Sequence, residues 1–127
     1  MTYRSELYQT RQWYISHEIL CAEPNDQESD EAQTVWENLI LIRANSPEEA
    51  YEKAMQHGRD SEQEIRVDGK KGYHRFLGLK DLTLVYDDLE DGAELEWHER
   101  ELTKVQAQGL TKQKDQLHAF NPTNFED

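Results

Sequence analysis

Two stretches in the first third of the chain carry the hydrophobic patterns of β-strands. Within residues 12–23 the odd positions form one mainly apolar face, made of Trp13, Ile15, His17, Ile19 and Cys21. Their alternation with a mixed set of residues predicts a strand with one buried face. Residues 35–44 instead carry bulky apolar side chains at both odd and even positions. That pattern predicts a central strand covered on both faces.

A short amphipathic helix is predicted next, from Ser46 to Gly58. Ser46 is suited to the N-cap, and Glu49 stands three residues later, where it completes a capping box. Gly58 is suited to the left-handed residue that ends a helix. The apolar stripe consists of Ala50, Tyr51, Ala54 and Met55. Because a helix of this length is marginal alone in water, we expect it to pack on a sheet.

Three further strands are predicted after the helix. A short one begins at residue 65 and ends in a hairpin turn at residues 68–69. Residues 73–86 return as a strand whose apolar positions change parity near Lys80, which predicts a β-bulge or a bend there. Residues 93–102 alternate again and predict a last, half-exposed strand.

This order of elements predicts an α+β fold: an antiparallel sheet of about five strands with one main helix packed on one face. The chain has 127 residues, a length that suits one hydrophobic core. We expect residues 1–11 to form an N-terminal segment, residues 12–102 a single α+β domain and residues 103–127 a polar C-terminal tail.

The chain is strongly acidic, with 27 Asp and Glu against 14 Lys and Arg and a formal net charge of −13 at pH 7. Such a charge repels phosphate backbones and anionic lipid surfaces, so we expect no nucleic-acid partner and no membrane partner. The longest apolar run, residues 39–42, is too short to span a bilayer, and residues 1–12 do not resemble a secretory signal. The single cysteine, Cys21, excludes an intrachain disulfide. We therefore expect a cytoplasmic location.

The sequence lacks the motifs of known catalytic, cofactor or metal sites. Its five histidines have neither H-x-H nor H-E-x-x-H spacing, so we expect no metal site and no cofactor. His17 stands out because it lies on the apolar face of its strand. A buried histidine bonded to a neighbour is the simpler interpretation. If the chain is an enzyme, the candidate catalytic residues are His17, Glu18 and Tyr51.

Four segments resemble a small bacterial family catalogued as domain of unknown function 4288. They are W-Y-I-S-H-E-I-L (13–20), W-E-N-L-I-L-I-R-A-N-S-P-E-E-A-Y-E-K-A (36–54), F-L-G-L-K-D-L (76–82) and D-L-E-D-G-A-E-L (88–95). The resemblance covers roughly residues 12–102 and implies a compact α+β domain. It implies no activity, so it assigns no functional residue.

Two classes of function are consistent with these features, and a third is weaker. The first is a non-enzymatic protein-interaction module with an acidic surface, which binds a protein partner or a second copy of itself. The second is a small enzyme or ligand-binding protein with a pocket between helix and sheet near His17. The third is an acidic mimic of nucleic acid. A flat, exposed aromatic patch favours the first, and a convergent pocket with strongly shifted titratable groups favours the second.

Self-association is predicted from the number of apolar faces. One helix covers one face of the sheet, whereas residues 35–44 are apolar on both parities. The second face must be covered by the C-terminal tail or by a second copy, and twofold pairing is the commonest arrangement in soluble proteins. We expect a homodimer that added salt favours, because salt screens the repulsion between two acidic chains.

Overall fold

The computed structural model describes residues 12–24, 32–67 and 69–121. The chain divides into two compact units, residues 1–97 and residues 98–127. Several predicted features lie outside the described residues: the N-terminal segment 1–11, the first residue of the turn at 68–69 and the last six residues of the tail.

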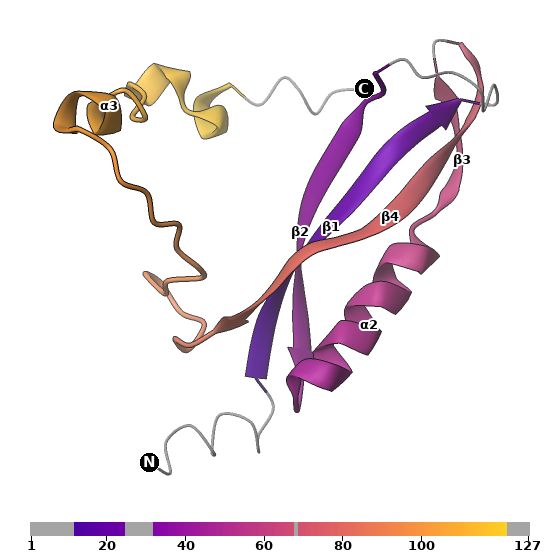
Figure 1. Ribbon diagram of the computed structural model, residues 1–127, viewed down its shortest axis with the longest axis horizontal. Coiled ribbons are helices and arrows are strands. Elements are labelled where there is room, and N and C mark those ends of the chain that lie inside the picture. The colour runs from indigo at the N-terminus through magenta and orange to yellow at the C-terminus, as the bar shows by residue number, and fades with distance from the viewer. Residues whose placement is uncertain (1–11, 25–31, 68, 122–127) are drawn as a thin grey trace. The chain divides into compact units, whose positions relative to one another are not determined.

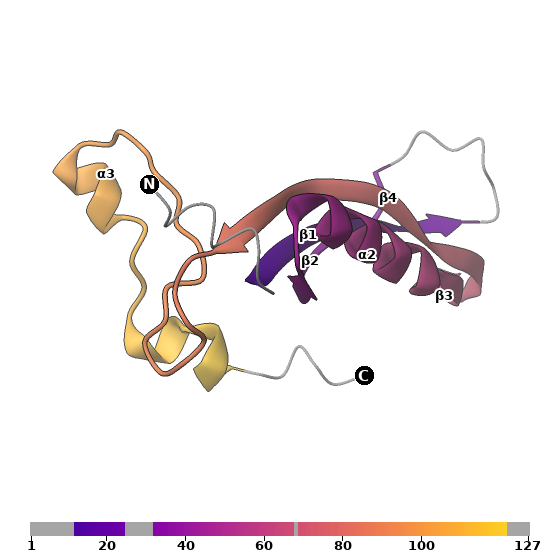
Figure 2. The same cartoon turned by 90° about the horizontal axis from the view of Figure 1, so that it is seen from below.

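The first unit contains an antiparallel sheet and one main helix, which confirms the predicted α+β class. Its strands are β1 (Gln12–Pro24), β2 (Val35–Ala44), β3 (Gln63–Val67) and β4 (Lys70–Val85), arranged in the order β2-β1-β4-β3. The helix, α2 (Pro47–Asp60), packs on one face, and the twisted sheet curls around it (Figures 1 and 2). The sheet has four strands rather than about five.

The predicted last strand is wrong: residues 93–102 form no strand in the part of the chain that the structure describes. A turn follows β4, in which the N–H of Ala93 donates to the carbonyl of Glu90 and the carboxylate of Asp87 accepts the N–H of Glu94. These local bonds satisfy the N–H groups of Ala93 and Glu94 without a neighbouring strand. The alternation of the sequence therefore marks a segment that does not join the sheet.

The central strand is β1, not β2, which corrects the predicted roles of the first two strands. β1 pairs with β2 on one side and with β4 on the other, and its residues Ser16 and Glu18 are buried. β2 lies at the edge of the sheet and is exposed along most of its length. Hydrophobicity on both parities predicts that both faces are apolar, but it does not determine whether the same chain covers them.

The predicted irregularity in β4 is confirmed. The pairing of β4 with β1 omits Lys80 at one position and Leu77 at another, so each is an extra residue in its strand. Gly78, next to the second position, has a φ of 143°, a conformation that glycine adopts at little cost. These two shifts allow a long strand to bend while its apolar residues keep facing the core.

The start of α2 was predicted correctly. The hydroxyl of Ser46 accepts the N–H of Glu49 at 3.1 Å, and the Glu49 carboxylate accepts the N–H of Asn45 at 2.6 Å. This reciprocal pair satisfies two backbone donors at the helix start, with the carboxylate reaching one residue before the cap.

The end of α2 differs from the prediction, because the helix continues through Gly58 to Asp60. Gly58 is buried in the helix, and a Cβ placed on it would lie 2.4 Å from ring atoms of Phe76. Its function is close packing rather than termination. The buried stripe consists of Ala50, Ala54 and Gly58, small residues four apart that let the helix approach the sheet. Tyr51, predicted in the stripe, is 47% exposed.

Removing the cap should weaken the first unit measurably. We expect Ser46→Ala to lower the free energy of unfolding by about 1 kcal/mol, because the N–H of Glu49 loses its acceptor. Chemical denaturation followed by circular dichroism measures the change. Ser46→Asp, which keeps an acceptor at the cap, is the matched control and should remain close to the unmodified chain. Equal loss in both variants would contradict a capping role.

The second unit is short and mainly polar. Its elements are a helix, α3 (Lys104–Gln108), and two 3-10 helices, η1 (Lys114–Gln116) and η2 (His118–Phe120). Thr103 caps α3, since its hydroxyl accepts the N–H of Gln106 at 3.1 Å. The Nζ atom of Lys114 lies 5.4 Å from the centre of the Phe120 ring. Local contacts of this kind order these elements, which have no buried residues.

Candidate functional site

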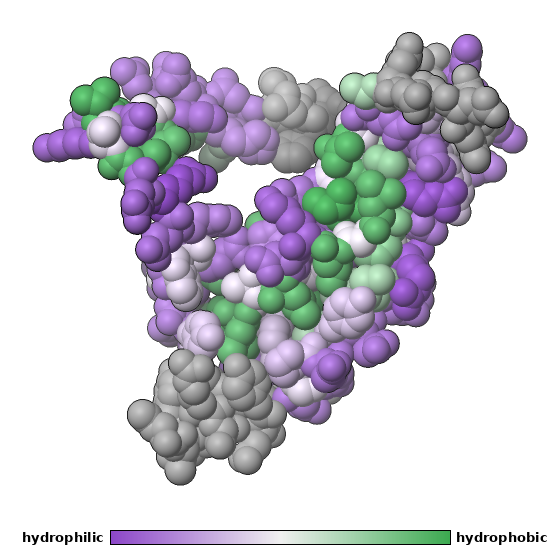
Figure 3. All heavy atoms as spheres, in the orientation of Figure 1, coloured by the Kyte–Doolittle hydropathy of each residue, from purple (hydrophilic) through white to green (hydrophobic). Residues whose placement is uncertain are grey.

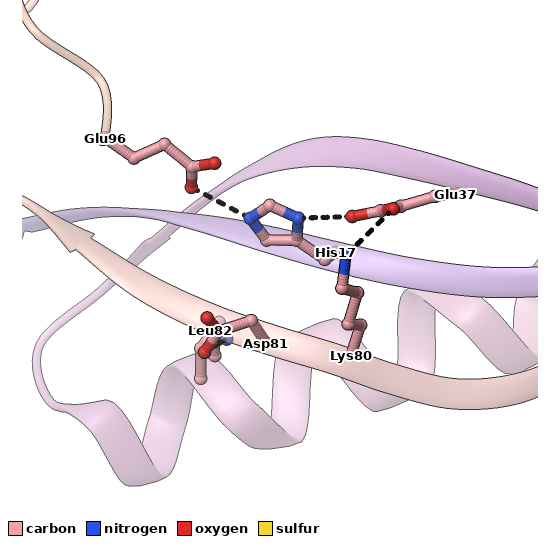
Figure 4. Close-up of polar contacts among 6 residues, drawn as sticks. All are labelled: His17, Glu37, Lys80, Asp81, Leu82 and Glu96. Carbon is pink, nitrogen blue, oxygen red and sulfur yellow. Dashed lines mark hydrogen bonds and ion pairs between the residues drawn. The ribbon is translucent and has the colours of Figure 1, made fainter. Parts of the chain in front are cut away.

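The most elaborate polar arrangement in the first unit surrounds His17 on the face of the sheet opposite α2 (Figure 4). Nδ1 of His17 lies 2.8 Å from a carboxylate oxygen of Glu37, and Nε2 lies 2.8 Å from one of Glu96. Glu37 belongs to β2 and Glu96 to the segment after β4. One side chain that is only 5% exposed therefore joins three parts of the chain.

The geometry requires a proton on each ring nitrogen if both carboxylates are ionised, because ionised carboxylates only accept hydrogen bonds. Burial by itself lowers the pKa of His17, but hydrogen bonds and charges from Glu37 and Glu96 outweigh it, and the pKa is raised above its ordinary value of 6.5. The imidazolium is thus the form that fits this site.

Other charges surround this histidine. Lys80 of β4 contacts the second oxygen of Glu37 at 3.4 Å. The hydrogen bond from His17 is the main cause that lowers the pKa of Glu37 below its ordinary value. Asp81 lies opposite His17 in the register of β1 and β4, and its carboxylate accepts the N–H of Leu82. His17 is thus bonded to two carboxylates, and one of them, Glu37, also contacts Lys80.

A second buried carboxylate lies on the opposite face of β1, toward α2. Glu18 is only 1% exposed, and one of its oxygens lies 2.6 Å from Nδ1 of His57 in the helix. Ser16, two residues earlier on the same face, is fully buried. A polar side chain at this depth is stable only when it is hydrogen-bonded, so the Glu18–His57 contact connects α2 to the central strand.

The three candidate catalytic residues do not form a common site. His17 and Glu18 are neighbours in a strand, so their side chains lie on opposite faces of the sheet. Tyr51 lies on the exposed side of α2. Both ring nitrogens of His17 are already bonded to carboxylates. The arrangement joins elements of the fold and presents no free base or nucleophile at this position.

In the part of the chain that the structure describes, Cys21 does not form a reactive site, and the residue types that bind metals do not form one either. Cys21 is buried, and burial is the main cause that raises the pKa of its thiol above the ordinary value. A raised pKa disfavours the reactive thiolate. The described residues contain no group of three or more His, Cys, Asp or Glu side chains placed to hold a metal ion.

An apolar surface lies along the exposed edge of the sheet, on the face opposite α2. Its residues Val35, Leu39 and Leu41 in β2 are 57%, 56% and 43% exposed. They share a face because they alternate along one strand, and we call these three residues the β2 surface. Figure 3 shows, from one side, how hydrophobic side chains gather along the strands of the first unit. Glu37 lies between Val35 and Leu39 in this row, so the adjacent apolar pair is Leu39 and Leu41. Exposed apolar residues of this kind mark interaction sites.

Sequence reasoning identified His17 but not the residues that bond to it. Glu37, Glu96 and His57 are separated from their partners by 20, 79 and 39 positions along the chain. Their contacts depend on strand order and on the path after β4, which hydrophobic periodicity does not encode. The only available signal was the placement of two polar residues, His17 and Glu18, within a strand that is otherwise largely apolar.

The fold is thus that of a small α+β protein, and its edge strand β2 exposes the β2 surface. Residues 13–97 match the family described as "Domain of unknown function (DUF4288)", and the chain belongs to that family. No curated protein and no solved structure matches the chain. In the described part of the chain, every helix is too short or too polar to cross a membrane.

Proposed function

We propose that the chain is a non-enzymatic protein-interaction module that binds a protein partner through the β2 surface. The observation that carries this proposal is the exposure of Val35, Leu39 and Leu41 in one row on the edge strand. Burying such side chains is favourable by about 25 cal/mol per Å² of apolar area, which a partner supplies. A second copy of the chain and a different protein are the two partners that this surface admits.

The charge of the chain favours some partners over others. A formal net charge of −13 attracts proteins with basic surfaces and repels nucleic acids. Charge of this kind acts mainly on the rate of encounter, whereas the apolar row supplies the contact area. The acidic surface therefore raises the rate of encounter, and the β2 surface supplies the contact area.

The alternatives have less support from the described residues. A ligand pocket near His17 needs ring nitrogens that are available to a ligand, and both are occupied by Glu37 and Glu96. A mimic of nucleic acid needs rows of exposed carboxylates. The β2 surface instead consists of the apolar residues Val35, Leu39 and Leu41, with the single carboxylate of Glu37 between them.

The test is to capture partners from an extract of the native cell with an immobilised chain. Untagged chain is added to the extract, so that a second copy can also be captured. Leu39→Lys places a charge in the middle of the β2 surface and should reduce the retained partner, whether another protein or the untagged chain, about tenfold or more. Leu77→Lys is the matched control, because Leu77 is 59% exposed in β4, away from the edge strand. Equal retention by the unmodified chain and by Leu39→Lys would contradict the proposal.

A further inference from the structure

The backbone of β2 presents hydrogen-bonding groups on the side away from β1. The N–H of Ala22 in β1 donates to the carbonyl of Thr34 at 2.9 Å, so these two residues form a hydrogen-bonded pair. Such pairs alternate with unbonded pairs along an antiparallel ladder, and the register places the even residues of β2 in the bonded positions. The odd residues of β2 therefore direct their N–H and C=O groups outward.

An independent contact supports this assignment. The carbonyl of Arg43, an odd residue, accepts a hydrogen bond from Nζ of Lys53 in α2, which lies outside the β1–β2 ladder. The odd residues before it, Val35, Glu37, Leu39 and Leu41, present their backbone groups along an edge that is unpaired among the described strands. These residues also carry the β2 surface, so one edge offers backbone pairing and apolar contact together.

We infer that a second copy of the chain occupies this edge, with β2 paired antiparallel to β2 of its partner across a twofold axis. The inference rests on the proposed function and names its partner. Strand addition at a free edge is an established way for sheets to bind a strand, with the backbone supplying hydrogen bonds and alternate side chains supplying specificity. The result is a continuous sheet of eight strands made from two sheets of four.

One register of this pairing is self-complementary in both charge and hydrophobicity. It places Ile40 on the twofold axis, Leu39 opposite the partner's Leu41, and Glu37 opposite the partner's Arg43. Each contact then occurs twice. A shift of the axis to Leu39 sets Glu37 against Leu41, and a shift to Asn38 sets Glu37 against Leu39. Opposite charges and apolar pairs across strands are favourable, whereas a charge facing a leucine is not.

The side chains needed for this register are accessible. Leu39 and Arg43 are exposed, and so is Glu37, whose two oxygens also contact His17 and Lys80 of its own chain. The Arg43 guanidinium lies 5.3 Å from the centre of the Trp13 ring, which holds it beside the strand. The overall charge of −13 opposes association. This long-range repulsion is screened beyond about 8 Å at physiological salt, while the pairs across the axis are in direct contact.

Disulfide cross-linking between two variants tests both the partner and the register. An equimolar mixture of Leu39→Cys and a tagged Leu41→Cys should form a tagged–untagged disulfide dimer under mild oxidation. The two Cα atoms would lie about 5.5 Å apart in the paired strands, within the range a disulfide allows. Leu39→Cys alone should cross-link at least about tenfold more slowly, because its two copies would be roughly 8 Å apart. Cys21 is buried and does not compete.

A control and a mass measurement complete the test. Leu77→Cys mixed with tagged Leu41→Cys should show no preferred cross-link, since Leu77 is exposed but lies on β4. Light scattering of the unmodified chain should give twice 15.0 kDa. A mass of 15.0 kDa at every concentration, or equal cross-linking in all mixtures, would overturn the inference. If the Leu39→Lys variant retains less of a different captured protein, the proposed function stands without the homodimer. If it retains as much of every partner as the unmodified chain, the proposed function and the homodimer are both overturned.

Discussion

At about pH 6, replacing His17 by leucine is expected to lower the free energy of unfolding by about 3 kcal/mol. The imidazolium donates to Glu37 and to Glu96, and each hydrogen bond to a charged group contributes about 1.5–3 kcal/mol. Leucine is of similar size and fills the space, but it leaves both carboxylates without this donor. The expected loss therefore comes from polar contacts rather than from a cavity.

The effect of this substitution should depend on pH in one direction. The folded protein raises the pKa of His17 above its ordinary value of 6.5, so the folded state binds this proton more tightly than the unfolded state. The stabilisation is fully present below about pH 6.5 and is lost as the pH rises through the folded pKa. The difference between the unmodified chain and His17→Leu should thus be larger at about pH 6 than at about pH 9.

Urea denaturation at both pH values measures the two free energies of unfolding. Lys80→Met is the matched control, because it removes only a solvent-exposed contact to Glu37 and should change stability little. A difference between the unmodified chain and His17→Leu that grows with pH would show that the histidine is neutral in the folded protein.

His57→Ala is expected to destabilise the protein by about 2 kcal/mol, the second-largest effect of a single substitution here. Glu18 is 1% exposed, and the variant removes the hydrogen-bond partner 2.6 Å from its side-chain oxygen. A buried polar group that loses its hydrogen-bond partner costs about 1–3 kcal/mol.

A double substitution separates the cost of the unsatisfied polar group from the value of the pair. In Glu18→Leu/His57→Leu both hydrogen-bonding groups are gone, so the loss of stability should be smaller than in His57→Ala alone. Thermal or chemical denaturation of the three variants measures this. Gln56→Ala, at an exposed neighbouring position of α2, should change stability by no more than about 0.5 kcal/mol. A double variant less stable than His57→Ala would refute the argument.

Features encoded by neighbouring residues could be predicted from the sequence. The cap of α2 follows from Ser46 and Glu49, which lie three positions apart, and the bulge of β4 follows from a change of parity at Lys80. In both cases the relevant groups are close in the chain. Local stereochemistry was therefore sufficient for the start of the helix and for the irregular strand.

Features that depend on distant residues could not be predicted in the same way. The helix continues past Gly58 because this glycine packs closely against Phe76 of β4. The sequence pattern, in contrast, predicts that a glycine at this position ends the helix. The partners of His17 and Glu18 come from other elements, so the two faces of β1 could not be assigned in advance. The exposed side of β2 depends on strand order, which hydrophobicity alone does not fix.

The most direct test of the account is amide hydrogen exchange along β2, measured by NMR at low and high protein concentration. At low concentration the even residues should exchange slowly, because β1 holds them, while Glu37, Leu39 and Leu41 exchange fast. At high concentration these odd residues should become protected as the second copy pairs with them. Fast exchange at the odd residues under all conditions would contradict pairing at this edge.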